Sequence, residues 1–94
     1  MTPASFKQSL SKPKPPECAP ALQALWWAAK DDWNAAHAIV MRHDDDKDCA
    51  WVHAHLHRVE GDLDNARYWY RQAGKRPATG ALDAEREAII AALL

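Results

Sequence analysis

Glycine, cysteine and long apolar runs are scarce in this chain of 94 residues, and each shortage excludes a class of site. The three glycines are widely separated, so no glycine-rich loop can cradle a phosphate group. The two cysteines, Cys18 and Cys49, form neither a CxxC motif nor a cysteine–histidine zinc pattern. No apolar run approaches the length that crosses a bilayer, so we expect no membrane span.

The first seventeen residues contain four of the six prolines and no apolar stretch. A secretory signal peptide requires such a stretch, so we expect a cytoplasmic protein with reduced cysteines. Cys18 and Cys49 precede equivalent helices, but neighbouring helix axes usually lie too far apart for an easy disulfide. We predict that residues 1–17 are a disordered tail, in which Phe6 and Leu10 are the candidates for contact with the remaining chain.

Catalytic arrangements are also missing. The serines all lie in the N-terminal tail, and no histidine or arginine flanks either cysteine to lower the pKa of its thiol. The formal net charge of −1 indicates no particular class of partner. We therefore predict a protein that is not an enzyme and has no cofactor.

The most informative feature that is present is a similarity between residues 30–37 and residues 60–67. Each segment contains an acidic turn followed by a bulky apolar residue, which is Trp33 in the first and Leu63 in the second. Self-similarity at a fixed spacing of this order is typical of stacked helical hairpins, in which each unit buries its apolar face against a neighbour. Five tryptophans provide large side chains for such a core.

Local signals place the helices. Pro20 suits the first turn of a helix, and Asp31 or Asp32 can cap the next one. The acidic connector 44–48 can cap a third helix, while Gly61 and Asp62 provide a turn and a cap for a fourth.

Apolar residues recur at helical spacing after the tail, and strand-like alternation is absent. The sequence therefore predicts an all-α domain over residues 18–94. We expect one antiparallel helix–turn–helix hairpin at about 20–43, a second at about 47–74 and a closing helix at about 80–93. Together they would form a short α–α solenoid.

The segment from Gly61 to Ala73 resembles the second helix of a tetratricopeptide or Sel1-like repeat. Five positions carry the resemblance, from the turn glycine to the closing alanine: Gly61, Leu63, Ala66, Tyr70 and Ala73. The string Trp-Tyr-Arg-Gln-Ala at 69–73 is similar to the end of Sel1-like units.

The first repeat departs from that pattern, because Asp31 replaces the glycine, Val40 the aromatic residue and His43 the last alanine. The resemblance covers residues 20–76 and implies a non-catalytic module that binds a protein or a short peptide segment. The whole chain also resembles small bacterial proteins of unknown function, which imply no activity.

In the repeats that this chain resembles, the first helix of each hairpin lines a concave groove. The matching positions are the partner-binding residues that we predict: Leu25, Ala28, Trp51, His55 and Arg58. An exposed tryptophan beside an arginine is a typical interface anchor, although the closing helix could instead cover Trp51. Stacking through an exposed Trp26 or Trp27 is a route to a homodimer.

Histidines suggest an alternative function. His53 and His57 are four residues apart on one helical face, with Glu60 three residues further, and this spacing suits metal ligands. His37 and His43 lie nearby on the preceding helix. The metalloprotease motif requires a glutamate where Ala54 stands, so metal binding rather than metal catalysis is the hypothesis. The competing interpretation is the polar face of an amphipathic helix, with one histidine packed between tryptophan side chains.

A second alternative is weak nucleic-acid binding through a basic and partly aromatic helix. Basic side chains with neighbouring aromatic rings can attract phosphates and stack on bases. The candidate residues are Arg67, Tyr68, Arg71, Lys75 and Arg76. Helical geometry turns Tyr70 inward, so nucleic acid is a less favoured partner than protein.

Overall fold

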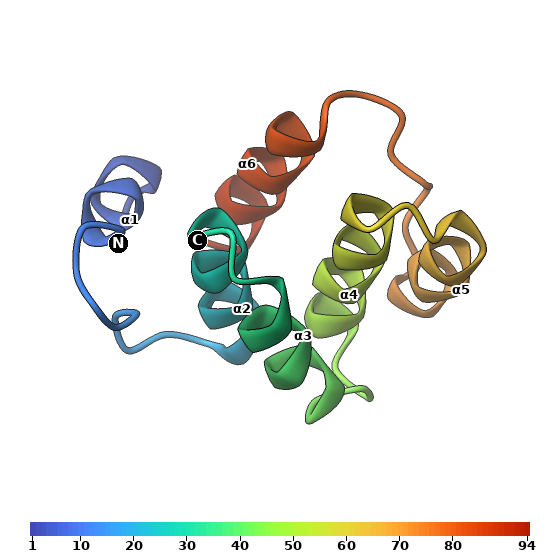
Figure 1. The fold of residues 1–94 in the computed structure, drawn as a ribbon, viewed down its shortest axis with the longest axis horizontal. Coiled ribbons are helices and arrows are strands. Elements are labelled where there is room, and N and C mark those ends of the chain that lie inside the picture. Colours follow the sequence, from blue (N-terminus) through green and yellow to red (C-terminus); the bar gives the residue numbers. More distant parts are fainter.

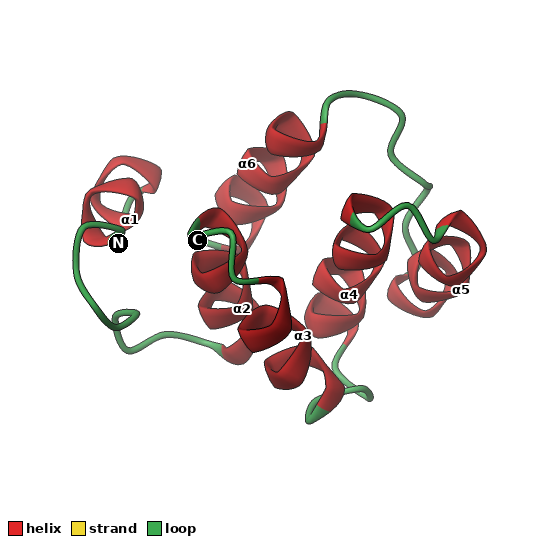
Figure 2. Cartoon of the chain, in the orientation of Figure 1, coloured by secondary structure: helices red, strands yellow, loops and turns green.

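A computed structural model describes all 94 residues, which form six α-helices and no β-strand (Figure 1, Figure 2). The helices are α1 (Pro3–Ser9), α2 (Pro20–Ala29), α3 (Trp33–Met41), α4 (Lys47–Val59), α5 (Leu63–Ala73) and α6 (Leu82–Leu93). The prediction of an all-α protein is confirmed. None of the six helices combines the length and the apolar character that crossing a bilayer requires.

Aspartate side chains begin three of the helices, as the sequence predicts. The carboxylates of Asp32, Asp46 and Asp62 each accept a hydrogen bond from a backbone N–H group in the first turn of α3, α4 and α5. These bonds satisfy amide groups that have no partner within the helix. Helix α2 instead begins with Pro20, which has no N–H group to satisfy.

The turn between α2 and α3 has the same backbone conformation as the turn between α4 and α5. Asp31 has a φ of 61°, and the matching Gly61 has a φ of 85°. The capping residues that follow also match: Asp32 has a φ of −100° and a ψ of 79°, and Asp62 has a φ of −88° and a ψ of 80°. In both turns the N–H group of the capping residue donates to a carbonyl oxygen five residues earlier, at 2.9 Å. The two similar segments therefore share one local structure.

We expect Asp31→Gly to stabilise the protein by about 1 kcal/mol, because glycine adopts a positive φ without the steric cost that a Cβ atom brings. The converse change, Gly61→Asp, should destabilise by a similar amount. A Cβ at Gly61 meets no atom within 4 Å, so backbone strain alone causes that loss. Urea unfolding of both variants provides the measurement. A less stable Asp31→Gly protein would show that the aspartate side chain matters more than its backbone strain.

The core forms around α2, which contacts α3, α4 and α6. The largest fully buried apolar side chains in it are Phe6, Leu25, Trp26, Val40, Val52, Leu56 and Ile89. A smaller cluster of Ala54, Ala66 and Tyr70 joins α4 to α5. Trp26 is fully buried and Trp27 is half-buried, so the expected exposure of Trp26 for stacking of two copies is wrong.

The N-terminal segment differs from the predicted tail because residues 3–9 form α1. Its Phe6 side chain is only 1% exposed and belongs to the main core. The Nε1–H group of Trp26 donates to the Ser9 hydroxyl oxygen at 3.0 Å, and the Lys30 ammonium donates to the Leu10 carbonyl at 2.6 Å. Burial of one aromatic ring thus orders a segment whose composition predicts disorder.

Both cysteines are free thiols, as expected. Cys49 is buried at the start of α4, beside Asp46 and Asp48. Burial raises the pKa of its thiol to about 12, and the neighbouring carboxylates contribute to the rise. The thiol therefore stays protonated and poorly nucleophilic.

Candidate metal centre

The face that the sequence assigns to a partner is covered by α6, which packs against both α2 and α4. Leu25 is fully buried, and His55 is 1% exposed. Ala28 and Trp51 are partly buried, and the Lys75 ammonium lies 4.2 Å from the centre of the Trp51 ring. Leu25 and His55 are therefore too buried to contact a partner, which corrects their expected exposure, while Ala28 and Trp51 line two separate cavities. The partner-binding surface as a whole stays a prediction.

Two of the expected groove residues instead belong to a buried polar network centred on Glu85 of α6. The Nδ1–H group of His55 donates to Glu85 Oε1 at 2.7 Å, and Arg58 Nη1 donates to the same oxygen at 3.1 Å. The hydroxyl group of Tyr70 donates to Glu85 Oε2. One carboxylate thus joins α4, α5 and α6.

The network keeps Glu85 ionised. Burial by itself would raise the pKa of this carboxyl group, but the hydrogen bonds from His55, Tyr70 and Arg58 outweigh burial and lower the pKa. Burial and the bond to Glu85 raise the pKa of Tyr70. The carboxylate is therefore a stable hydrogen-bond acceptor, and Nε2 of His55 is the buried side-chain nitrogen of this network that has no hydrogen-bond partner.

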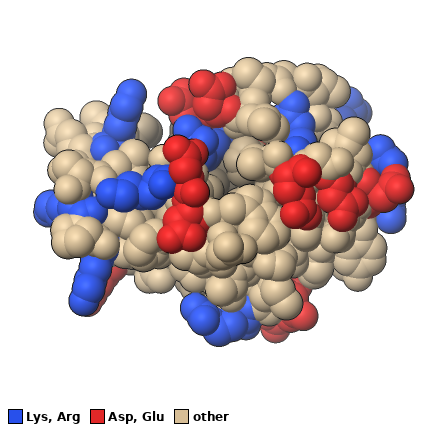
Figure 3. Space-filling view, in the orientation of Figure 1, with Lys and Arg blue, Asp and Glu red and all other residues tan.

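The basic residues predicted to contact nucleic acid are exposed on α5 and after it. Arg67 pairs with the exposed Asp64, and Trp69 is half-buried against His53. Acidic and basic side chains are interspersed on this side of the molecule in Figure 3. No phosphate-binding site is defined by these positions.

Three histidines from two helices converge next to α5. His37 extends from α3, and His53 and His57 extend from successive turns of α4. One ring nitrogen from each histidine lies within 4.8 Å of the other two. The Nε2 atoms of His37 and His53 are 3.1 Å apart. Imidazole nitrogens are common ligands of zinc, copper and nickel ions, so this group can hold a metal.

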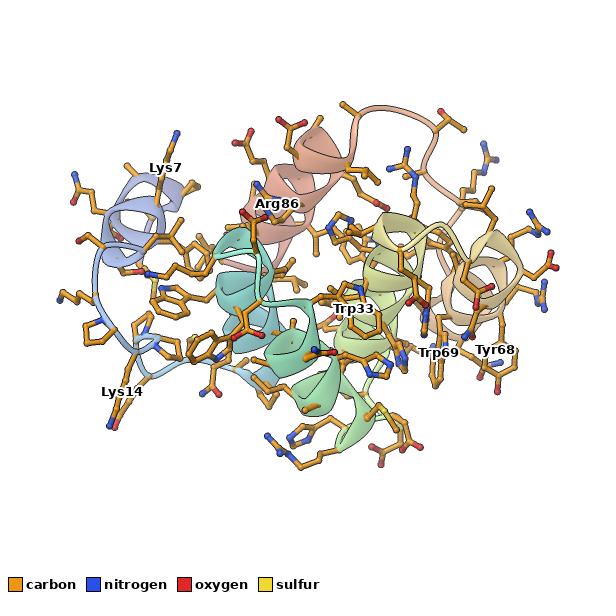
Figure 4. The ribbon with its side chains drawn as sticks, in the orientation of Figure 1. Lys7, Lys14, Trp33, Tyr68, Trp69 and Arg86 are labelled. Carbon is orange, nitrogen blue, oxygen red and sulfur yellow. The ribbon has the colours of Figure 1, made fainter.

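Aromatic rings hold the histidines in place. Trp33 stacks on His37 with a centroid distance of 4.5 Å, and Trp69 stacks on His53 at 4.0 Å. Figure 4 shows Trp33 beside α3 and α4, with Trp69 between α4 and α5. The Trp33 indole N–H is itself anchored to the Leu56 carbonyl at 2.7 Å. Two histidines thus each stack on one tryptophan, whereas the sequence-based interpretation placed a single histidine between tryptophans.

Glu60 lies outside the group of three histidines, although its carboxylate lies within 4.8 Å of ligand atoms of His57 and Asp62. Its Oε1 atom accepts a hydrogen bond from Nδ1–H of His57 at 2.6 Å, so Glu60 orients the ring and leaves Nε2 available. A carboxylate in this position is a usual second partner of a metal-binding histidine. The third nitrogen comes from His37 instead. Sequence spacing alone could not add His37, because its approach depends on how α3 packs against α4.

His53 has an unusual electrostatic environment. Burial lowers the pKa of its imidazole to about 3, and the nearby His57 and His37 contribute to the decrease. Burial also lowers the pKa of His37. The Nδ1 atom of His53, on the other side of the ring from the Nε2 atom that faces His37, is buried without a hydrogen-bond partner, and so is Nε2 of His55.

His43 lies near His37 in the sequence, but it lies outside the group of three histidines.

Comparison of the chain with known protein families, curated proteins and solved structures finds no match. The resemblance to tetratricopeptide and Sel1-like repeats therefore stays a prediction.

Proposed function

We propose that this protein binds a transition-metal ion through His37, His53 and His57. The observation that supports the proposal most strongly is the convergence of three imidazole nitrogens within 4.8 Å of one another. In this assignment the protein is not an enzyme, and the ion is held between α3 and α4. The binding residues thus include two of the sequence-based candidates, His53 and His57, with His37 in place of Glu60.

The spacing of the nitrogens suits coordination. A tetrahedral ion with metal–nitrogen bonds of about 2.0–2.1 Å places its ligand nitrogens about 3.3–3.4 Å apart. The Nε2 atoms of His37 and His53 lie at 3.1 Å, which is close to this value. Binding would therefore require small side-chain rotations and no rearrangement of the helices.

The protonation state of the site also favours a metal. A metal ion competes with protons for imidazole, so a histidine with a low pKa is available over a wide pH range. The pKa of His53 is about 3, and the ring is therefore neutral at physiological pH. Glu60 fixes the tautomer of His57 through its Nδ1–H group.

We expect Zn²⁺ or Co²⁺ to bind with one-to-one stoichiometry and to perturb the imidazole resonances of all three histidines. His57→Ala should weaken binding by more than about 10–100-fold, the usual cost of losing only an outer-shell partner of a metal ligand. Glu60→Gln should give a loss within that range. Calorimetry and histidine NMR provide the measurements.

The matched control is His43→Ala, which removes a partly buried histidine outside the cluster and should leave affinity unchanged. Unchanged imidazole spectra at stoichiometric metal would overturn the proposed function. Equal effects of His43→Ala and His57→Ala would show that the metal binds elsewhere.

The two other functions predicted from the sequence stay predictions. A protein-interaction role has less support at the predicted surface, because Leu25 and His55 are buried there and only Ala28, Trp51 and Arg58 keep partial exposure. The matching backbone conformations of the two inter-helix turns support a helical-repeat origin, and we propose that α2–α3 and α4–α5 are two related hairpins. Nucleic-acid contact through α5 has exposed basic residues in its favour and no observation that identifies a binding site.

A further inference from the structure

We propose that Met41 supplies a fourth ligand to this site and that the ion it binds most tightly is Cu(I). The inference rests on the proposed metal-binding function and adds the identity of the ion. It follows from where Met41 lies relative to the three histidines.

The four residues form two pairs, each with helical i, i+4 spacing. His37 and Met41 are four residues apart on α3, and His53 and His57 are four residues apart on α4. Residues at this spacing lie on the same face of a helix, one turn apart. Helices α3 and α4 pack against each other. All four side chains line a single cavity of about 340 Å³.

Met41 has the freedom to complete the site. It is the last residue of α3, and 56% of its surface is exposed. Its unbranched side chain has three rotatable bonds, so its sulfur can reach toward a bound ion at little cost.

The chemistry of this donor set favours Cu(I). Thioether sulfur is a soft ligand that selects Cu(I), and imidazole binds copper well. Three neutral imidazoles and a neutral thioether carry no charge, which suits a monovalent ion better than a divalent one. Asp44 also lines the cavity, but its carboxylate is not among the ligand atoms that lie close together.

The test compares Cu(I) and Zn²⁺ affinities in the full chain under anaerobic conditions. All proteins carry Cys18→Ser, because Cys18 is a partly exposed thiol that would compete for Cu(I). A chromophoric Cu(I) chelator serves as the competitor. The variants are Met41→Leu, which removes the sulfur and keeps the apolar side chain, and Asp44→Asn, which removes the oxygen ligand.

We expect Met41→Leu to weaken Cu(I) binding by at least about tenfold and to leave Zn²⁺ binding unchanged, since a neutral thioether stabilises the soft Cu(I) ion far more than the harder Zn²⁺ ion. Asp44→Asn should change neither affinity. X-ray absorption of the Cu(I) complex should show a sulfur neighbour that disappears in Met41→Leu. Trp69 lines the same cavity, so its fluorescence should report binding directly.

Unchanged Cu(I) affinity in Met41→Leu, or an equal loss of Cu(I) and Zn²⁺, would overturn the role of Met41. Loss of Zn²⁺ affinity in Asp44→Asn, with Zn²⁺ bound more tightly than Cu(I), would overturn the choice of ion and identify an oxygen ligand instead. Both results leave the three-histidine site intact. If the histidines respond to neither ion, the proposed function fails together with this inference.

Discussion

Glu85→Ala is expected to lower the free energy of unfolding by about 3–5 kcal/mol, the usual cost of removing one partner from a buried charged network. The side chain of Glu85 is 7% exposed and accepts hydrogen bonds from His55, Arg58 and Tyr70. Its removal leaves three donor side chains without this acceptor, two of them on α4 and one on α5. Alanine is a good helix former, so the loss comes from the network and not from α6 itself.

The stability lost in Glu85→Ala should depend on pH and should be smaller in acid. The pKa of Glu85 in the folded protein is below its ordinary value of 4.5. A group with a lowered folded pKa stabilises the protein above its unfolded pKa, and this contribution disappears as the pH falls through the folded pKa. The difference between wild type and Glu85→Ala should therefore be full at neutral pH and shrink below about pH 4.5.

Glu87→Ala is the matched control, because Glu87 is exposed on the same helix. Its effect on stability should be small at every pH. Urea unfolding at several pH values measures both variants. A Glu85→Ala protein as stable as Glu87→Ala would show that the network contributes nothing to the attachment of α6.

Trp26→Ala is expected to cost about 3–5 kcal/mol, the range for truncating a large buried aromatic side chain. Trp26 is fully buried in the core, and its indole N–H donates to Ser9. A chain of 94 residues typically has a total stability of about 5–14 kcal/mol. Loss of this one ring therefore removes a large share of the total, and the variant should be close to unfolding near body temperature.

Trp27→Ala provides the comparison, because Trp27 is the next residue on α2 and is only half-buried. The two rings meet edge to face, with their centroids 4.9 Å apart. Because Trp27 is less buried, its removal should lower the free energy of unfolding by less than removal of Trp26. Denaturant unfolding followed by far-ultraviolet circular dichroism measures both. Equal losses of unfolding free energy would mean that the two rings contribute equally to the stability of the core.

The sequence predicts those parts of the fold that depend on local signals. Capping and turn residues influence only the backbone within a few positions of themselves. They are the aspartates at the starts of α3, α4 and α5, together with Pro20 and Gly61, and the helices begin where these residues indicate. The start of α6 is less well marked, since Ala81 precedes it without a side-chain cap. Helix α1 was missed, because it depends on burial of Phe6 against distant helices.

The candidate sites were predicted in part. His53 and His57 share a helix, so their spacing identified them, whereas His37 joined them only through packing of α3 against α4. The expected exposure of Leu25 and His55 was wrong for a related reason. Periodicity shows that α6 has an apolar side, but it does not show which helices that side covers. The burial of Glu85 likewise depends on how α6 packs against α4.

The attachment of α1 has a consequence for how the protein opens. This seven-residue helix is held mainly by one ring and two hydrogen bonds, and a proline-rich linker joins it to α2. Such a segment can undock at a lower free energy than global unfolding requires. Undocking wets the indole edge of Trp26 while the other five helices stay assembled. We therefore expect a sub-global open form, in which Phe6 of a neighbouring chain can take the place that Phe6 has left.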